Sequence, residues 1–407
     1  NGDFAEIGSD LVTNGDFSAA GINLVSNPNF TDTGSELVVN GTFVGVANGT
    51  DVITLSGWSA YNTPISRNVE SERLEIVTSG SNEGAKLSIT TTIGKSYKLQ
   101  YTATGDTGAQ GIYISGISGV NTSTETTFYF VAIATTTTIN FRAGTNSAGT
   151  TYYDDISVKE LGADWTEEAG DPDSISFGEN GLTIVQSTDL GTDNRAYQFN
   201  VTSADKSYKV TYTIHSAQYT ADNRVQYYDG DSYVNLPEQG VGTHTFYYTR
   251  EGTNNTWIFN LKTTTASATD FVTISSISVQ ELGEGWTLGT GWSIGDSKAV
   301  YDGTGGTSRL KQDLTVTANK YYKISLTVLS NEGTGTNVVD FGAHRVNDLH
   351  LPASATPYVF YGLSDATAET LSIYGRASEV FEVTNITVQE VGQDWTVQEP
   401  AGQSVTF

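Results

Sequence analysis

The sequence predicts an all-β protein built from tandem antiparallel β-sandwich modules. Short runs that alternate apolar and polar residues recur along the 407-residue chain, and no helical period extends over a useful length. The stretch YYDDISVKELGADWT (152–166) returns in altered form at 272–287 and at 381–396. In each copy an isoleucine leads a short strand-like run and a tryptophan follows nine positions later. This repeat therefore marks a junction between modules.

A shorter repeat occupies the beginning of the chain. NGDF (1–4) recurs within LVTNGDF (11–17), LVSNPNF (24–30) and LVVNGTF (37–43), so that the asparagines and the phenylalanines are 13 residues apart. In each copy an Asn-Gly or Asn-Pro turn precedes a phenylalanine that can anchor the turn to a core. A 13-residue unit cannot fold alone. We therefore expect the repeats to stack on one another, to lie along the first sandwich, or to insert into another subunit.

The three long modules show the same landmarks in the same order. The strongest strand signal of the first, KSYKLQYTA (95–103), corresponds to DKSYKVTYTI (205–214) and NKYYKISLTV (319–328). Each is followed by an aromatic strand, a further strand and the closing strand at the junction. We assign five segments: 1–35 as the repeat region (continuing into 36–43), 36–161, 162–282 and 283–391 as three modules, and 392–407 as the opening strand of a partial fourth.

The junction itself predicts closely coupled modules. Ile156 and Val158 point to one face of a half-buried strand and Ser157 to the other. Gly162 can end the strand, and Trp165 opens the next segment with too few residues between for a flexible tether. Packing in a core or between modules is the favoured role for the junction tryptophans. Stacking on a sugar is the alternative.

The final segment leaves two interpretations open. DWTVQEPAGQSVTF (394–407) matches DWTEEAGDPDSISF (164–177), and a single opening strand cannot bury a core. Either the natural polypeptide continues, or another chain completes this strand by strand addition.

Composition limits the partners. The formal net charge is −26, so the chain would be repelled by nucleic acid and by anionic membrane surfaces. Cysteine is absent, which excludes disulfides and thiolate chemistry. No apolar run approaches the roughly 18–20 residues needed to cross a bilayer. We expect neutral, cationic or metal-bridged partners, with neither nucleic acid nor membrane insertion.

Several of these stretches resemble known modules. The opening strand LVVNGTF, Gly57-Trp58, the central KSYKLQYTA strand and the closing DDISV strand resemble carbohydrate-binding-module-like jelly rolls. The junction ELGEGWTLGTGWSIGDSKAVYDGTG (281–305) resembles tandem modules of bacteriophage structural and tail-fibre proteins. The resemblance covers nearly the whole chain and implies jelly-roll modules. It says little about activity, because one fold hosts many functions.

The resemblance also implies a structural calcium ion. Jelly rolls of this type often use an aspartate beside the closing strand, and Asp154 and Asp155 of the first module match that position. The second module has Ser275-Ser276 there and the third Thr384-Asn385, so only the first module matches. A solvated turn is the other interpretation of the aspartate pair, and no other cofactor is expected.

Exposed aromatic residues are the candidates for glycan binding, because sugar faces stack on tryptophan and tyrosine. The candidates are Trp58 and Tyr61 in the first module, Tyr227, Tyr228 and Tyr233 in the second, and Trp292 and Tyr301 in the third. Each has a core-packing role as its alternative.

No pattern in the sequence indicates catalysis. The four histidines lack metal-type spacing, no G-x-S-x-G elbow is present, and the Gly-rich stretches read as turns. We expect a non-enzymatic phage virion or fibre protein, at the virion surface or extracellular, that contacts other copies of itself, other virion proteins or host-surface glycans. The alternative is a secreted cellular protein that binds glycans or forms filaments by strand complementation.

Overall fold

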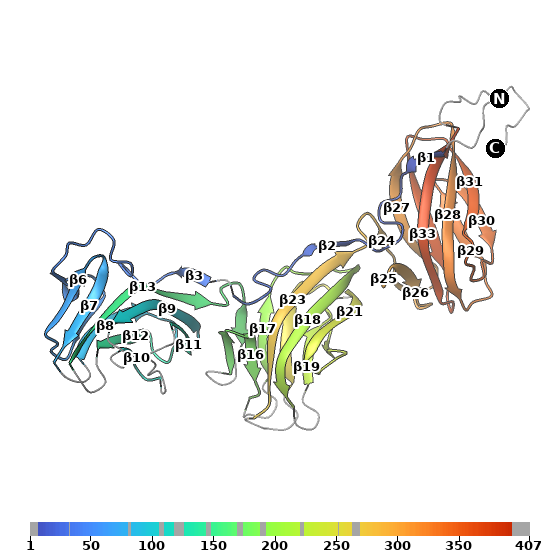
Figure 1. Ribbon diagram of the computed structural model, residues 1–407. Helices are drawn as coiled ribbons and strands as arrows, with labels where there is room; N and C mark the ends of the chain where they lie inside the picture. The colour runs from blue at the N-terminus through green and yellow to red at the C-terminus, as the bar shows by residue number, and fades with distance from the viewer. Residues whose placement is uncertain are drawn as a thin grey trace, which may run out of the picture.

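The chain is all-β, as the sequence predicts, and consists of an N-terminal segment followed by three consecutive β-sandwiches (Figure 1). The computed structural model describes residues 7–31, 33–79, 83–105, 110–117, 126–143, 148–168, 174–187, 193–219, 224–250, 252–262 and 269–392. Asn1–Phe4 and nearly all of the predicted fourth module, Trp395 included, lie outside these residues. Among the described residues there is no helix long and apolar enough to span a lipid bilayer.

The first sandwich packs a sheet of order β11-β9-β13-β7-β6-β4 against a sheet of order β10-β12-β8-β5. Its strands are β4 (Thr50–Asp51), β5 (Trp58–Tyr61), β6 (Ser66–Glu70), β7 (Arg73–Thr78), β8 (Glu83–Thr90), β9 (Ser96–Gly105), β10 (Gln110–Ile114), β11 (Thr127–Val131), β12 (Thr136–Ala143) and β13 (Gly149–Leu161). One turn of 3₁₀ helix, Val52–Thr54, precedes β5.

The second sandwich packs a sheet of order β15-β16-β23-β18-β21 against a sheet of order β14-β17-β22-β19-β20. Its strands are β14 (Thr166–Glu168), β15 (Ile175–Gly178), β16 (Gly181–Val185), β17 (Asn194–Gln198), β18 (Lys206–Gln218), β19 (Arg224–Tyr228), β20 (Tyr233–Asn235), β21 (Gly242–Arg250), β22 (Trp257–Lys262) and β23 (Phe271–Leu282).

The third sandwich packs a sheet of order β25-β26-β33-β28-β31 against a sheet of order β24-β27-β32-β29-β30. Its strands are β24 (Thr287–Leu288), β25 (Trp292–Gly295), β26 (Lys298–Tyr301), β27 (Ser308–Thr315), β28 (Lys320–Asn331), β29 (Asn337–Phe341), β30 (His344–Leu349), β31 (Tyr358–Ser364), β32 (Ala368–Gly375) and β33 (Phe381–Val391).

The central and closing strands form the middle of one sheet in every sandwich. β9, β18 and β28 contain the predicted central strands, and each lies beside its closing strand, β13, β23 or β33. Tyr97, Leu99 and Tyr101 alternate into the core on β9, as the sequence pattern predicts. The same alternation buries Tyr208, Val210 and Tyr212 on β18.

The N-terminal segment, residues 7–43, runs along all three sandwiches in reverse order (Figure 1). β1 (Ile7–Asp10) pairs with β33 of the third sandwich, β2 (Ala20–Asn23) with β23 of the second, and β3 (Thr33–Glu36) with β13 of the first. The repeats therefore neither stack on one another nor gather on the first sandwich. Each of the three described repeats belongs to a different sandwich, and two of them are distant in sequence from the sandwich they contact.

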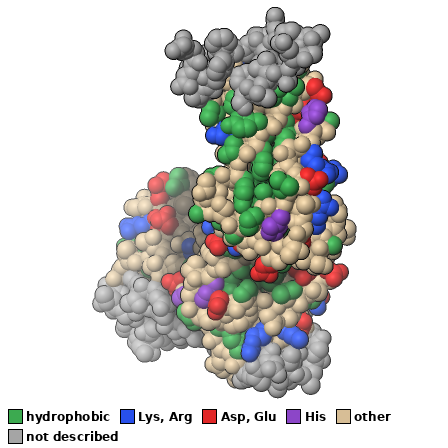
Figure 2. All heavy atoms as spheres, turned by 90° about the vertical axis from the view of Figure 1, so that its right-hand side faces the viewer, with side chains coloured by type: hydrophobic (Ala, Val, Ile, Leu, Met, Phe, Trp, Pro, Cys, Tyr) green, Lys and Arg blue, Asp and Glu red, His purple; other side chains and the backbone are tan. Residues whose placement is uncertain are grey.

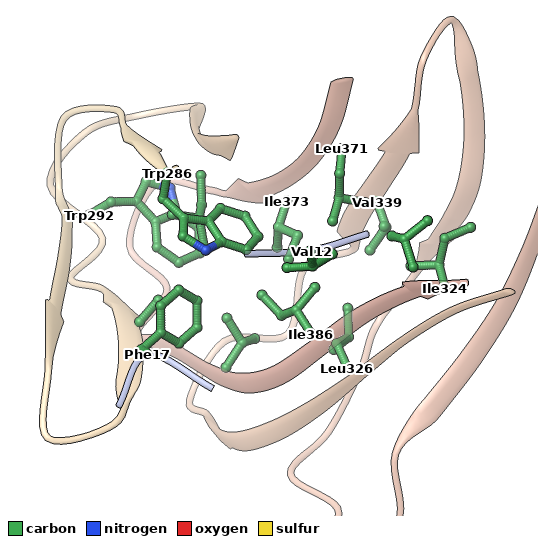
Figure 3. Close-up of a cluster of buried hydrophobic side chains, with 14 of the residues drawn as sticks. Val12, Phe17, Trp286, Trp292, Ile324, Leu326, Val339, Leu371, Ile373 and Ile386 are labelled. Carbon is green, nitrogen blue, oxygen red and sulfur yellow. The ribbon is translucent and has the colours of Figure 1, made fainter. Parts of the chain in front are cut away.

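Each core contains side chains from this segment. Val12 and Phe17 lie in the core of the third sandwich with Trp286, Ile324 and Ile386 (Figure 3). Val25 and Phe30 lie in the second core, and Val38 and Phe43 in the first. The N-terminal segment is thus a structural part of three separate hydrophobic cores.

Candidate functional site: the docking grooves of the N-terminal segment

The N-terminal segment docks where each closing strand would otherwise have an open edge. The first half of β13 pairs with β7, whereas its second half pairs with residues 33–36 of the segment. In the same way, the first half of β23 pairs with β16 and its second half with β2. The first half of β33 pairs with β26 and its second half with β1. An unpaired strand edge is a template for other chains. The segment closes that edge in all three sandwiches.

The same backbone hydrogen bonds recur at every groove. The N–H groups of Leu11, Leu24 and Leu37 each donate at 2.9 Å to a closing-strand carbonyl, that of Val388, Val279 or Val158. In return the junction isoleucines donate at 2.9 Å to the segment: Ile386 to Gly15, Ile277 to Pro28 and Ile156 to Gly41. Docking is therefore strand addition with a fixed 13-residue period.

A polar side chain before each repeat ties the two strands together. One oxygen of Asp10 accepts from the N–H of Val12 at 3.1 Å and from that of Val388 at 2.9 Å. Asn23 bridges Val25 and Val279 at 3.2 and 2.9 Å, and Glu36 bridges Val38 and Val158, both at 2.9 Å. Two carboxylates and one amide thus make the same contact at the three grooves.

An aromatic pair anchors each repeat. Phe17 meets Trp286 at 5.4 Å between ring centroids, Phe30 meets Trp165 at 5.1 Å, and Phe43 meets Trp58 at 5.8 Å. The three phenylalanines are at most 1% exposed. Complete burial of a phenylalanine stabilises by about 1.5–3 kcal/mol, and a well-placed aromatic pair adds about 0.5–1.5 kcal/mol. These pairs are the main apolar anchors of docking.

A tight turn presents each phenylalanine to its tryptophan. Asn14, Asn27 and Asn40 have φ values of 51°, 46° and 60°, in the left-handed region that asparagine tolerates better than most residues. Their carbonyls accept from the N–H groups of Phe17, Phe30 and Phe43 at 3.2, 3.1 and 3.3 Å. The invariant Asn-x-x-Phe spacing therefore reflects this turn.

Glutamine side chains clamp the segment in the second and third sandwiches. Gln312 Oε1 accepts from the N–H of Thr13 at 2.8 Å while its Nε2 donates to the Thr13 carbonyl at 3.0 Å. Gln198 makes the same pair of bonds to Ser26, at 3.1 and 2.7 Å. Both glutamines are buried, at 4% and 6% exposure. Each clamp holds the backbone of a repeat that is distant in sequence.

The first sandwich lacks this clamp. In the first sandwich, Trp58 lies opposite Leu87 on the neighbouring strand. In the other two, the residue after the tryptophan pairs with Tyr197 or Lys311. Gln198 and Gln312 therefore occupy the position that Leu87 has in the first sandwich. Trp286 Nε1 also donates to the carbonyls of Thr13 and Asn14, and Trp165 Nε1 to that of Asn27. Trp58 Nε1 has no hydrogen-bond partner among the described residues.

Neighbouring sandwiches are joined by a second recurring contact. Ser96 Oγ of the first accepts from the N–H of Phe177 in the second at 2.8 Å. Ser207 Oγ of the second accepts from Ile294 in the third, also at 2.8 Å. Lys95 adds an ion pair of 2.7 Å to Glu167 at the first junction. Burial raises the pKa of Glu167, despite the opposing effect of the Lys95 ammonium.

The structure places four of the predicted glycan-binding residues inside cores. Trp58, Tyr227, Trp292 and Tyr301 are 6%, 7%, 2% and 0% exposed. Trp58 packs on Phe43 and Phe141, and Trp292 packs on Tyr301 and Phe381. Buried rings offer no face to a sugar, so we correct the interpretation of these four residues to core packing.

The other three candidates lie nearer the surface. Tyr228 and Tyr233 form an edge-to-face pair with centroids 5.2 Å apart, and Arg195 lies 5.2 Å over the Tyr233 ring. Tyr61 is separate from them, with Lys86 at 5.3 Å from its ring. All three are partly exposed. The second sandwich thus brings together two candidates, and their role in glycan binding stays a prediction.

The predicted calcium ligands lie in the bulge that separates the two halves of β13. The N–H of Asp155, which has φ of 50°, donates to Asp154 Oδ1 at 2.7 Å. Partial burial raises the pKa of Asp154. No group of three or more metal-binding side chains occurs in the described part of the chain. The bulge geometry accounts for the aspartate pair, and calcium binding stays a prediction.

Apolar side chains also gather on the outside of the third sandwich (Figure 2). The exposed hydrophobic residues of its edge strand β31 are Val359 and Tyr361, at 43% and 50% exposure. The equivalent strand of the second sandwich, β21, has Tyr247, which lies against Gly295 of the third. This surface carries no residue that the sequence singled out.

Sequence reasoning missed the side chains that hold the segment in place. Asp10, Asn23 and Glu36 have the same 13-residue spacing as the recognised repeats, so a longer alignment of the copies would have found them. No comparable signal identifies Gln198 and Gln312. They lie in strands of differing length and sequence, and only the folded structure places them beside the repeats.

Comparison with known proteins gives fold likeness alone. No protein-family model and no curated protein matches the sequence. The tandem CBM22-1–CBM22-2 domains of Paenibacillus barcinonensis Xyn10C are 11% identical, with a TM-score of 0.23, over 56% of this chain and 94% of theirs. A chain of Sulfolobus Turreted Icosahedral Virus is 10% identical, with a TM-score of 0.21, over 82% of this chain and 90% of that one.

A third structure is described as a triple jelly roll in the turret of an archaeal virus. It is 10% identical, with a TM-score of 0.19, over 90% of this chain and 97% of that one. All of these likenesses are too low to carry functional information to this chain.

Proposed function

We propose that this protein is a non-enzymatic structural rod, in which the N-terminal segment ties successive jelly-roll sandwiches into one stiff unit. The observation that carries the proposal is the distribution of three repeats over three sandwiches, each repeat contributing a valine and a phenylalanine to a different core. A linker that enters every core limits rotation between neighbours. The serine contacts at both junctions act in the same direction.

The proposed setting is a bacteriophage virion, with the rod projecting from the surface as a fibre or spike. The sequence resemblance to tandem modules of phage structural proteins supports this setting, and the net charge of −26 suits a surface that does not contact nucleic acid. Attachment to host glycans through Tyr228 and Tyr233 is the finer proposal. Many weak contacts from copies of one rod would add through effective concentration.

A second candidate is a secreted filament protein assembled by strand complementation. It is favoured by the docking itself, since each closing strand already accepts an added strand from a distant part of the chain.

Solution scattering tests the structural role. We expect the double variant Phe17→Ala/Phe30→Ala to broaden the distribution of end-to-end distances, because two anchors are lost while each sandwich keeps its remaining strands. Ser59→Ala, an exposed position on β5, is the control. An unchanged distance distribution in the double variant would refute the role of the segment.

Glycan attachment needs a separate measurement. Retention on immobilised bacterial surface glycans should fall for Tyr228→Ala and Tyr233→Ala and persist for Tyr361→Ala, which is half exposed on another sandwich. Equal retention of all three variants would reject these tyrosines as the binding site.

A further inference from the structure

The three repeats differ at one position that contacts the closing strand. Repeats 11–17 and 37–43 have glycine after the asparagine, Gly15 and Gly41, whereas repeat 24–30 has Pro28. All three residues accept a hydrogen bond from a junction isoleucine at 2.9 Å. The position therefore makes the same bond with side chains of very different shape.

Glycine is required where it occurs. A Cβ atom on Gly15 would lie 1.9 Å from the carbonyl oxygen of Ile386, and one on Gly41 would lie 1.9 Å from that of Ile156. Both clashes are with backbone, which cannot turn aside as a flexible side chain can. A proline at either position would bring the same Cβ atom and meet the same oxygen.

The closing strands that face glycine differ in backbone conformation from the one that faces proline. Asn385 and Asp155, just before the junction isoleucines of the third and first sandwiches, have left-handed φ values of 51° and 50°. Ser276, the equivalent residue of the second sandwich, is not among the described residues with positive φ. The register irregularity of β23 also lies at 274–276, before Ile277, whereas β33 breaks register between Thr384 and Thr387. The groove that accepts proline thus has its own backbone shape.

The other contacts described above are common to the second and third grooves. The bridging side chain, the leucine N–H, the asparagine turn and the phenylalanine anchor occur at all three grooves. A shift of the segment by 13 residues would preserve every one of them. Repetitive strands are prone to such slippage unless something opposes it.

We propose that the third groove is a selective peptide-binding site, in which the Gly15/Asn385 pair excludes the proline-containing 24–30 repeat and so leaves that repeat to the second sandwich. The third groove takes a peptide that has an acid or amide residue, Leu, Val, any residue, Asn, Gly, any residue and Phe in that order, which residues 10–17 supply. It rejects the 24–30 repeat because the proline Cβ meets the Ile386 carbonyl. Selectivity of this kind works by excluding the wrong partner.

This inference goes beyond the structural role and does not depend on a virion setting. A stiff rod needs only that the segment docks; the inference states which repeat docks where. The two can fail separately, because an unselective segment would still stiffen the rod.

The first test uses the full chain and two glycine substitutions. In Gly15→Ala, hydrogen exchange at the amides of Leu11 and Phe17 should quicken at least tenfold, while the 24–30 repeat keeps its protection. Gly34→Ala is the matched control, since its Cβ would lie 3.6 Å from the nearest atom, an ordinary contact. Protection within threefold of wild type in Gly15→Ala would overturn the steric argument.

The second test measures selectivity on a folded chain. A protease site inserted after Thr31 lets residues 1–31 be cut free after folding and exchanged against photo-crosslinking peptides of residues 7–18 or 20–31. The 7–18 peptide should label the third sandwich, and its Gly15→Pro form should label it at least tenfold less. The 20–31 peptide should label the third sandwich only as its Pro28→Gly form.

The outcomes are decisive in either direction. Equal labelling of both grooves by both unmodified peptides would overturn the assignment of repeats. Absence of labelling by any peptide, although the segment has been cut free, would overturn peptide recognition itself.

Discussion

The first sandwich and the other two bind the N-terminal segment with the same backbone bonds but with different side chains. Gln198 and Gln312 clamp the segment in the second and third sandwiches, where the first has Leu87. The indole N–H groups of Trp165 and Trp286 bind segment carbonyls, whereas that of Trp58 has no partner among the described residues. The repeat at the first sandwich continues directly into that sandwich, so its local concentration is always high.

The difference shows what a distant strand needs that a neighbouring one does not. Closing a loop costs conformational entropy that grows with its length. Repeat 11–17 meets a closing strand that lies at 381–391, and repeat 24–30 meets one at 271–282. Polar clamps with two hydrogen bonds each offset part of that cost. The adjacent repeat docks without such a clamp, through its apolar anchors, its backbone bonds and the Glu36 bridge.

The largest expected effects come from removing the aromatic anchors. Phe43→Ala should lower the free energy of unfolding of the first sandwich by about 3–5 kcal/mol, as for other buried phenylalanines. Phe17→Ala should cost the third sandwich less, because its repeat can leave the groove and limit the loss to the docking free energy. Denaturant unfolding, monitored by hydrogen exchange within each sandwich, measures the stability loss of both variants. A larger loss for Phe17→Ala would contradict the comparison.

The glutamine clamps should have the next largest effect. Gln312→Leu gives the third sandwich the residue found in the first, and it removes two hydrogen bonds to Thr13. With each bond contributing about 0.5–1.5 kcal/mol, undocking of the 11–17 repeat should become easier by about 1–3 kcal/mol. Hydrogen exchange at Thr13 measures this. The reciprocal Leu87→Gln should not strengthen docking of the 37–43 repeat, and a comparable gain there would dispute the loop-length explanation.

The tryptophans allow a finer comparison. Trp286→Phe and Trp58→Phe remove similar apolar area, but only the former removes hydrogen bonds to the segment, at 3.1 and 3.2 Å. We expect Trp286→Phe to cost about 1 kcal/mol more. Equal losses, measured by thermal unfolding of the two variants, would show that the indole bonds contribute nothing net.

The smallest effect concerns the junction between the first and second sandwiches. Burial raises the pKa of Glu167 above its ordinary value of 4.5, so the folded chain binds a proton there more readily than the unfolded one. Stability from this group should therefore rise as the pH falls through the raised pKa and decline at higher pH. Glu167→Gln should flatten this dependence in unfolding measured from acidic to neutral pH. An unaltered pH profile would mean that Glu167 is ionised without penalty.

The alternating strands and the recurring junction made the fold class predictable from the sequence. Tyr97, Leu99 and Tyr101 show the period of a half-buried strand, and that local signal survives in the structure. The role of the first 43 residues was not predictable in the same way. Their spacing shows duplication, but pairing of Leu11 with Val388 depends on contacts between the two ends of the chain. Periodicity contains no information about such partners.

The candidate site shows the same limit. The sequence identified Trp58 and Trp292 as large aromatic residues, and it could not tell a sugar platform from an anchor for Phe43 or a core residue beside Tyr301. Burial depends on which strands cover a residue. At Trp58 the covering group is the turn that ends at Phe43, which the sequence analysis placed in the same module without indicating that it covers Trp58.

The reversed order of docking has a consequence for biosynthesis. A ribosome makes the 11–17 repeat before any sandwich exists, and it makes the groove for that repeat last, in β33. At about 5–20 residues per second, the time between synthesis of Phe17 and synthesis of its partners Trp286 and Ile386 is on the order of tens of seconds. The segment must then dock from its C-terminal end, first 37–43, then 24–30 and finally 11–17. Until that last step, the nascent chain displays a free strand with an uncovered phenylalanine, which makes newly synthesised copies the most vulnerable to pairing with one another.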